Sequence, residues 1–317
     1  MDKYEFKKRV LFLGVPDMGY IGLDTLLFNG VNIVGVMGPL KTHNTYHQFK
    51  NFVKMRKQNF IEYDRLDNPE TLDIIKNLQP DIAVVCSFNN KIPKEFMDII
   101  PGGILNIHPS LLPKYRGGNP YSWAIINGEQ ETGVTIHFIS DKFDEGDIVM
   151  QERCHINKSE TMGTLFNRTN HIGCRMLLQA LYQFDKDGEL KRIPQPQGDF
   201  VKAPNIKDTE LFIDFNKTAI ESERFVRALN PYISAMCVFN NQIVKLHKVS
   251  VANIPNQENF KNGEICEIKD DKVYIKTAEG CIIPEVMQFS GYFTGDCADF
   301  IEIVKPKIGD KFTNGKA

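Results

Sequence analysis

The chain has 317 residues, of which 42% are hydrophobic and 25% are charged, and its formal net charge is −2. These values are typical of an ordinary folded protein, exclude extensive disorder, and give the chain no bulk attraction for nucleic acid. The apolar run after the basic N-terminus spans only residues 10–13, which is too short for a signal peptide, and no stretch reads as transmembrane. We therefore expect a cytoplasmic protein without a membrane partner.

Seven cysteines occur in the chain, an odd number, and none has CxxC spacing. This pattern predicts neither a disulfide framework nor a zinc site.

The first part of the chain alternates apolar, β-branched strands with amphipathic helices. We expect strands at 10–13, 31–37, 60–63, 82–86, 104–107, 133–139 and 148–156, and helices near 20–27, 45–58, 69–78, 93–99 and 160–184. Ser159 is a plausible N-cap of the long last helix. The alternation predicts an α/β fold, a Rossmann-like, mostly parallel sheet with helices on both faces. The glycines after the first strand do not match GxGxxG, so a dinucleotide site is not supported.

A change of composition predicts two domains. Residues 186–205 are rich in charge, glycine and proline, which is typical of a linker between a first domain at 1–185 and a second at 206–317. The second domain begins with a helix at 219–229 and continues with short strands at 234–239, 242–251, 262–268, 272–277 and 281–287. Several short strands at this spacing predict a small antiparallel, OB-like β-barrel. The C-terminal tail gives no strong signal.

Candidate functional residues lie in the stretch from Gly102 to Asp147. A short apolar strand ends with Asn106 and His108, and a second apolar run leads into an acidic loop that contains Asp144. If the two strands lie close in one parallel sheet, these three side chains can converge at its carboxyl edge, where open α/β sheets bind ligands.

An amide and a protonated imidazole are both donors, suited to an oxygen that becomes negative in a tetrahedral intermediate. A carboxylate beside the imidazole would keep it charged and fix its tautomer, and it can relay a proton from an attacking amine. The trio therefore suits direct acyl transfer without a serine or cysteine nucleophile.

Each of these residues also has a structural interpretation. A lone histidine such as His108 is more often structural than catalytic, and Asn106 can simply cap a turn. The aspartates of the acidic loop can form a solvated turn or a hard-cation site, but no glutamates are arranged as a calcium loop needs, so no metal is predicted. Arg116 is either an anion clamp or a surface residue.

The central stretch resembles the signature of the formyltransferases that use 10-formyltetrahydrofolate, through the strings NIHPSLLPKYRG and ETGVTIHFISDKFDEGDIV. The resemblance extends to LFLGVPDMG near the start and to RALNPYISA with the strands that follow it. In extent the chain is similar to the two-domain methionyl-tRNA formyltransferase type over nearly its whole length.

The resemblance implies that Asn106 and His108 stabilise the oxyanion, while Asp144 keeps His108 charged and helps to deprotonate the amine. It also implies two sets of residues at the folate donor. The folate-contacting SLLP of the family is matched by Ser110, Leu111, Leu112 and Pro113. The place where relatives line the pterin pocket, largely through backbone groups, is taken by Phe88, Asn89, Asn90, Lys91 and Ile92.

The resemblance leaves the acceptor open between initiator methionyl-tRNA and a small amine, such as a nucleotide-linked amino sugar. In tRNA-acting relatives the loop after the second strand is extended and rich in glycine and basic residues. Here residues 38–58 depart from that pattern but still contain five basic residues. The second domain contains more acidic than basic residues, whereas a tRNA platform is expected to be basic.

Two other functions remain possible from the sequence. A hydrolase would release formate from the same folate with water as the nucleophile, and a regulatory protein would bind folate without turnover. The intact trio argues against the second of these.

Overall fold

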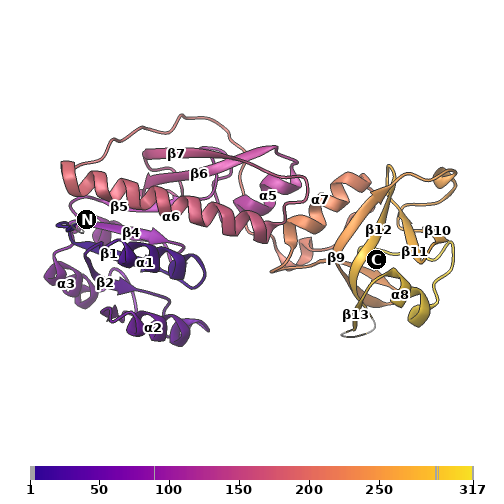
Figure 1. Cartoon of the computed structure of the whole chain (residues 1–317), viewed down its shortest axis with the longest axis horizontal. Helices are drawn as coiled ribbons and strands as arrows, with labels where there is room; N and C mark the ends of the chain where they lie inside the picture. Colours follow the sequence, from indigo (N-terminus) through magenta and orange to yellow (C-terminus); the bar gives the residue numbers. More distant parts are fainter. Residues whose placement is uncertain (1–3, 89, 290, 292, 316–317) are drawn as a thin grey trace. The chain divides into compact units, whose positions relative to one another are not determined.

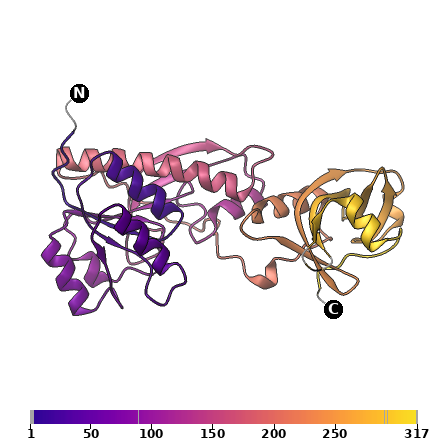
Figure 2. The same ribbon diagram turned by 60° about the horizontal axis from the view of Figure 1, so that its bottom comes forward.

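The computed structural model describes residues 4–88, 90–289, 291 and 293–315 (Figures 1 and 2). The chain divides into two compact units. The first unit comprises the residues up to Gly117 together with 132–154 and 167–202, and the second comprises 118–131, 155–166 and the chain from Ala203 onward. Within the described ranges, no helix is long and apolar enough to cross a membrane.

The first unit contains a seven-stranded sheet of order β3-β2-β1-β4-β5-β6-β7. Its strands are β1 (Val10–Gly14), β2 (Ile33–Met37), β3 (Phe60–Ile61), β4 (Ile82–Cys86), β5 (Ile104–His108), β6 (Glu131–Phe138) and β7 (Ile148–His155). The pairings from β3 through to β5 are parallel. The predicted Rossmann-like, mostly parallel sheet is confirmed.

One assumption about this sheet is wrong. The candidate residues were expected to converge because their two strands would be parallel, but β6 runs antiparallel to β5, with Leu105 opposite Phe138 and His108 opposite Thr135. The end of β6 therefore lies beside the start of β5, at the edge away from His108. The loop that contains Asp144 must return along the sheet to reach the histidine.

Helices cover both faces of this sheet, as Figure 2 shows. They are α1 (Met18–Phe28), α2 (Tyr46–Met55), α3 (Pro69–Leu78), α4 (Lys94–Met97) and α6 (Met162–Asp187). Phe12 packs with residues of α1, α2 and α6, whereas its neighbour Leu11 packs with residues of α3 and α4. Because adjacent strand residues face opposite sides, burial on both faces explains the unbroken apolar strands. Helix α6 begins later than expected, and the side chain of Thr161, not Ser159, accepts the N–H of Thr164 at 3.2 Å.

The second unit is built on a six-stranded antiparallel sheet of order β10-β11-β12-β9-β8, with β13 paired to β12. Its strands are β8 (Ala235–Phe239), β9 (Gln242–Ala252), β10 (Ile265–Lys269), β11 (Lys272–Lys276), β12 (Cys281–Phe289) and β13 (Phe293–Gly295). Its helices are α5 (Pro120–Ile126), α7 (Ala219–Leu229) and α8 (Cys297–Val304), with short 3₁₀ turns at Asp208–Glu210 and Gln257–Asn259. The predicted antiparallel architecture is confirmed.

The C-terminal tail, which gave no signal in the sequence, joins the two edges of this sheet. Thr313 pairs with Val238 on the edge strand β8, and Lys311 pairs with Glu264 next to the opposite edge strand β10. Between them the ring of Phe312 is fully buried in the core. Pairing both exposed edges with the tail removes unpaired N–H and C=O groups that would otherwise face solvent.

Part of the segment whose composition predicts a linker pairs with the first unit. Ile193 and Ile148 exchange two backbone hydrogen bonds of 2.9 and 2.8 Å, and the N–H of Tyr115 donates to Val201 at 2.6 Å. Ile193 and Val201 are therefore hydrogen-bonded to residues that follow and precede the acidic loop in the sequence, Ile148 and Tyr115.

Candidate active site

Strand β5 presents two polar side chains on one face of the sheet. Asn106 and His108 are two residues apart, so they point to the same side. Asn106 is half-buried, and His108 is only 4% exposed. A buried imidazole needs hydrogen-bond partners, and its surroundings provide them.

The loop after β6 brings Asp144 to His108. The N–H of Phe138 donates to the carbonyl of Asp147 at 2.9 Å, so the loop folds back onto the end of its own strand. A Cβ added to Gly146 would lie 1.8 Å from the carbonyl oxygen of Phe138, so this close return requires glycine. Asp144 adopts φ 55°, in the left-handed region, and its Oδ1 lies 3.6 Å from His108 Nδ1. The loop, rather than parallel pairing, creates the expected convergence.

The carboxylate of Asp144 has a second contact through its other oxygen. Oδ2 accepts the backbone N–H of Gly117 at 2.9 Å, and the side chain is 14% exposed. This charge-assisted hydrogen bond fixes the carboxylate and leaves Oδ1 directed at the histidines.

His137 is a fourth member of the cluster, and sequence reasoning missed it. Its Nε2 lies 3.1 Å from the amide nitrogen of Asn106 and 3.8 Å from Asp144 Oδ1, and the residue is 1% exposed. In the sequence it is only one polar residue inside an apolar strand. The antiparallel register, which places His137 directly opposite Asn106, is the signal that identifies it.

The hydrogen bonds of His137 define its tautomer. Its Nδ1 lies 2.8 Å from the carbonyl oxygen of Phe138, which only accepts, so Nδ1 carries a proton. Burial, and then the charge of His108, hold the pKa of His137 well below its ordinary value, so the ring is neutral and Nε2 accepts. Asn106 must therefore donate one amide N–H to His137. Within the described part of the chain its second amide N–H has no partner.

His108 lies between two acceptors. Its Nε2 lies 2.9 Å from the carbonyl oxygen of Tyr115, so Nε2 donates, and its Nδ1 faces the carboxylate of Asp144. The 3.6 Å between Nδ1 and the carboxylate is an ion-pair separation and is too long for a hydrogen bond.

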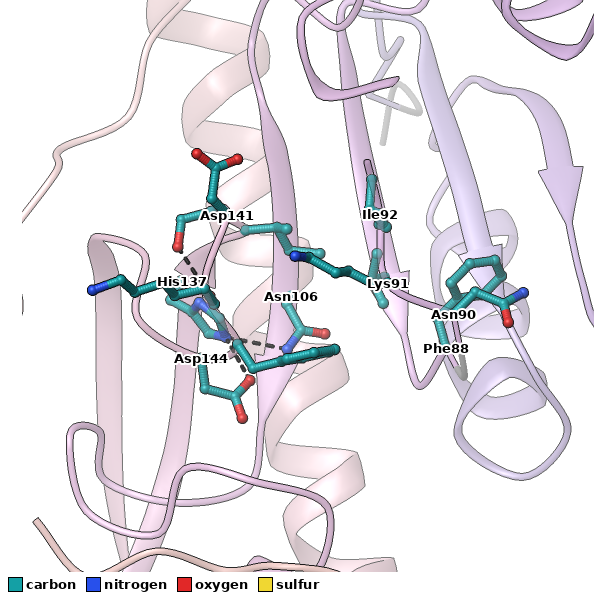
Figure 3. Close-up of a pocket in the computed structure, with 13 residues that line it drawn as sticks. Phe88, Asn90, Lys91, Ile92, Asn106, His137, Asp141 and Asp144 are labelled. Atoms are coloured by element: carbon teal, nitrogen blue, oxygen red, sulfur yellow. Dashed lines mark hydrogen bonds and ion pairs between the residues drawn. The ribbon is translucent and has the colours of Figure 1, made fainter. Parts of the chain in front are cut away.

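A pocket with a volume of about 120 Å³ adjoins this cluster. Figure 3 shows Asn106, His137 and Asp144 on one side and residues of the loop after β4 on the other. The lining residues are Val85, Phe88, Asn90, Lys91, Ile92, Asn106, His137, Ile139, Ser140, Asp141, Lys142, Phe143 and Asp144. His108 does not line the pocket, but it lies 3.6 Å from Asp144, which does. The expected ligand residue Asn89 lies outside the described residues.

The loop after β4 is supported by Tyr63. The hydroxyl of Tyr63 donates to the carbonyl of Gly38 at 2.9 Å and accepts the side-chain amide of Asn90 at 3.3 Å. The ring of Phe88 stacks on Tyr63 with centroids 6.5 Å apart. Burial raises the pKa of Tyr63 to about 12, so its hydroxyl stays protonated as a donor. The pocket wall opposite the cluster is thus positioned by side-chain contacts.

The structure does not bring Ser110, Leu111, Leu112 and Pro113 to this pocket. Ser110 is fully buried and donates its hydroxyl to the carbonyl of Lys114 at 2.7 Å, and Leu112 is 3% exposed. Ser110 stabilises the turn after β5, and the contact of all four residues with folate stays a prediction.

Arg116, for which the sequence allowed an anion clamp or a surface residue, is bound to protein acceptors. Its Nη2 donates to Gln195 Oε1 at 2.6 Å, and its Nη1 lies 3.2 Å from Glu145 Oε1. Sequence reasoning also missed Gln195, because it lies in the segment with linker composition. Among the described residues no group of three or more His, Cys, Asp or Glu could hold a metal ion.

Comparison with protein families gives two matches that together span most of the chain. A formyl transferase model matches residues 27–181, and a formyl transferase C-terminal domain model matches residues 205–304. The methionyl-tRNA formyltransferase of Alkaliphilus oremlandii is 30% identical over 289 residues, covering 89% of this chain and 92% of the relative. The methionyl-tRNA formyltransferase of Fervidobacterium nodosum is 33% identical over 291 residues, with the same coverage of 89% and 92%.

Solved structures show the same fold at lower identity. An N-formyltransferase from Helicobacter canadensis, in complex with folinic acid and dTDP-3-aminofucose, aligns with a TM-score of 0.65 at 20% identity, covering 88% of this chain and 99% of that chain. HypX from Aquifex aeolicus, in complex with tetrahydrofolic acid, aligns with a TM-score of 0.64 at 19% identity, covering 96% of this chain. This chain spans about half of HypX, 48% of its length.

Proposed function

We propose that this chain, which belongs to the formyl transferase family, moves the formyl group of 10-formyltetrahydrofolate to a primary amine. One observation carries the proposal. Asn106, His108 and Asp144 come from two separate segments and meet, together with His137, beside a pocket. Donors and a carboxylate arranged in this way suit acyl transfer through a tetrahedral intermediate.

The reaction forms one bond to the formyl carbon and breaks another. The amine nitrogen of the acceptor attacks the formyl carbon, and the carbonyl oxygen takes the negative charge. The intermediate then collapses with loss of the bond to N10 of the folate, which leaves as tetrahydrofolate. The amine loses one proton and N10 gains one, so no oxidant or further reactant is needed.

In this proposal the free amide N–H of Asn106 donates to the oxyanion. His137 accepts the other amide N–H and so orients the donor before substrate binds. His108, next to Asp144, contributes positive charge, with its ring centroid 6.2 Å from that of His137. Preorganised donors and charges of this kind are the largest single contribution to many acyl transfers.

Asp144 acts as the proton acceptor in this proposal. It lines the pocket, its Oδ2 is held by Gly117, and it takes the proton of the attacking amine directly or through one water. Its other oxygen, Oδ1, faces His108 Nδ1 at 3.6 Å.

The folate ring would occupy the pocket beside these groups. A flat heterocycle with a polar edge needs apolar walls and a few polar groups. The walls are formed in part by Phe88 and Ile92, and Asn90 is among the polar residues of the lining.

Two acceptor classes each have support. Relatives that match about nine-tenths of this chain are named methionyl-tRNA formyltransferase, which favours initiator methionyl-tRNA. A fold neighbour solved with dTDP-3-aminofucose favours a nucleotide-linked amino sugar. The structure adds that the basic stretch at 38–58 is partly neutralised, because Lys41 and Lys50 pair with Glu62, and Arg56 pairs with Asp24.

The test is an acceptor screen with purified protein and 10-formyltetrahydrofolate. Formylated product and tetrahydrofolate are measured with initiator methionyl-tRNA and with a panel of dTDP-linked amino sugars. Equal amounts of product and tetrahydrofolate with one acceptor support a transferase. Formate release at the same rate without any acceptor would instead identify a hydrolase. Transfer to tRNA should weaken steeply with rising salt, whereas transfer to a small amine should not.

A further inference from the structure

Gln195 is a buried glutamine whose side-chain amide is fully bonded. The residue is 6% exposed, and its Nε2 donates to the carbonyl oxygens of Asp144 and Gly146, both at 2.8 Å. Its Oε1 accepts from Arg116 Nη2 at 2.6 Å and from Arg116 Nε at 3.2 Å. Both N–H donors and the oxygen are therefore used, and the amide can adopt only one orientation.

The two carbonyl groups that Gln195 binds belong to the turn that carries Asp144. At this turn Asp144 adopts φ 55°, and a Cβ on Gly146 would lie 1.8 Å from the carbonyl oxygen of Phe138. A backbone in this region persists only where its surroundings hold it. Gln195 holds this turn through its two hydrogen bonds and is not among the residues that line the pocket.

The same glutamine links this turn to the segment that binds the carboxylate. Gly117, which donates its N–H to Asp144 Oδ2, directly follows Arg116, whose guanidinium is bound by Gln195. Arg116 Nη1 also lies 3.2 Å from Oε1 of Glu145, the residue between Asp144 and Gly146 in the sequence. The backbone and the carboxylate of Asp144 are thus fixed by one connected set of hydrogen bonds.

Gln195 is placed by pairing rather than by a helix or strand of its own. Ile193, two residues earlier, exchanges two backbone hydrogen bonds with Ile148 at the start of β7. This pairing holds the segment beside the loop at 139–147.

We propose that Gln195 is a positioning residue that sets the carboxylate of Asp144 against His108. The inference rests on the proposed function, because it assigns Asp144 a part in proton transfer. Gln195 does not line the pocket, so its loss should lower the rate of the chemical step without weakening folate binding.

The test uses Gln195→Glu in the full chain. Glutamate keeps an oxygen for Arg116 but places a carboxylate oxygen against two carbonyl oxygens, which pushes the turn away. We expect kcat to fall by about tenfold or more, the scale of a misplaced reacting group, while KM for 10-formyltetrahydrofolate changes by less than about threefold. Gln197→Glu makes the same chemical change at an exposed side chain of the same segment and should leave kcat unchanged.

A double-mutant cycle separates positioning from a general structural role. If Gln195 acts through Asp144, then Gln195→Glu should add nothing to the loss caused by Asp144→Asn. Gln195→Met, a neutral change of similar length, should lower kcat as well. Tetrahydrofolate binding by calorimetry should stay within about threefold of wild type in Gln195→Glu and Gln195→Met.

Additive losses in the cycle, an unchanged kcat, or variants that fail to fold would each overturn the positioning role. Failure of the proposed function has a different result. In that case wild type transfers no formyl group to any acceptor, or Asp144→Asn is as active as wild type.

Discussion

Replacing Asp144 with asparagine removes the negative charge of this side chain while keeping its shape. The new side chain can still accept the N–H of Gly117 through its oxygen. The carboxylate Oδ1 lies 3.6 Å from His108 Nδ1, and the two side chains are 14% and 5% exposed. At this separation two unit charges interact by about 4 to 5 kcal/mol at an effective dielectric constant near 20. Rearrangement of the amide and entry of water recover part of this energy.

We expect kcat of Asp144→Asn to fall by about 100-fold or more, which corresponds to about 2.7 kcal/mol of activation free energy. The assay follows tetrahydrofolate formation with the best acceptor from the screen, at saturating donor. Thermal unfolding should show a Tm close to that of wild type. Asp73→Asn is a suitable control, because Asp73 is a 71% exposed carboxylate on α3 that also pairs with a base, Lys76. A folded Asp144→Asn enzyme with near-wild-type turnover would refute the assignment of this carboxylate.

Three further predictions concern the groups that build the two units. The pKa of His137 is depressed in the folded state, so the unfolded state binds more protons and stability should fall as pH drops below about 6.5. In His137→Gln this loss, measured by denaturant unfolding at pH 7.5 and 5.5, should be smaller. In Gly146→Ala the added Cβ would displace the turn at the Phe138 carbonyl. We therefore expect the activation free energy from kcat to change more than the free energy of unfolding, which enzyme kinetics and thermal unfolding measure. Phe312→Ala should destabilise the second unit by about 3–5 kcal/mol in denaturant unfolding, since its ring is fully buried.

Each of these has a matched control. His47→Gln changes an exposed histidine and should leave the pH dependence of stability unchanged. If the stability loss between pH 7.5 and 5.5 were reduced equally in both variants, the result would contradict the role of His137. Gly188→Ala adds a Cβ with no atom within 4 Å and should leave kcat unchanged, even though its φ is positive. Ile308→Ala removes a 58% exposed side chain of the same tail, and a loss of stability as large as that of Phe312→Ala would speak against closure of the sheet by the tail.

Much of the fold follows from short-range sequence patterns. The helices Pro69–Leu78 and Ala219–Leu229 and the strand Ile82–Cys86 have the predicted bounds. Their signals are local, because a proline, an apolar stripe or an unbroken apolar run lies inside the element itself. The placement of Asn106 and His108 on one face of β5 is equally local, because a spacing of two residues decides it.

The tail shows where local patterns are insufficient. Helix α8 and the bridges of Lys311 and Thr313 gave no usable signal in the sequence. Their partners are strand edges far away along the chain, and only the finished sheet exposes those edges for pairing.

The sequence by itself determined most of the strands and helices, that the first sheet is mostly parallel, and which residue types reach the end of β5. Only the tertiary structure decided that β6 is antiparallel, that the acidic loop returns over its own strand, and that His137 and Gln195 join the site. The physical reason is distance along the chain. Periodicity reports interactions between residues a few positions apart, whereas Asn106 with His137 and Asp144 with Gln195 are contacts across 31 and 51 positions, set by strand register and loop path.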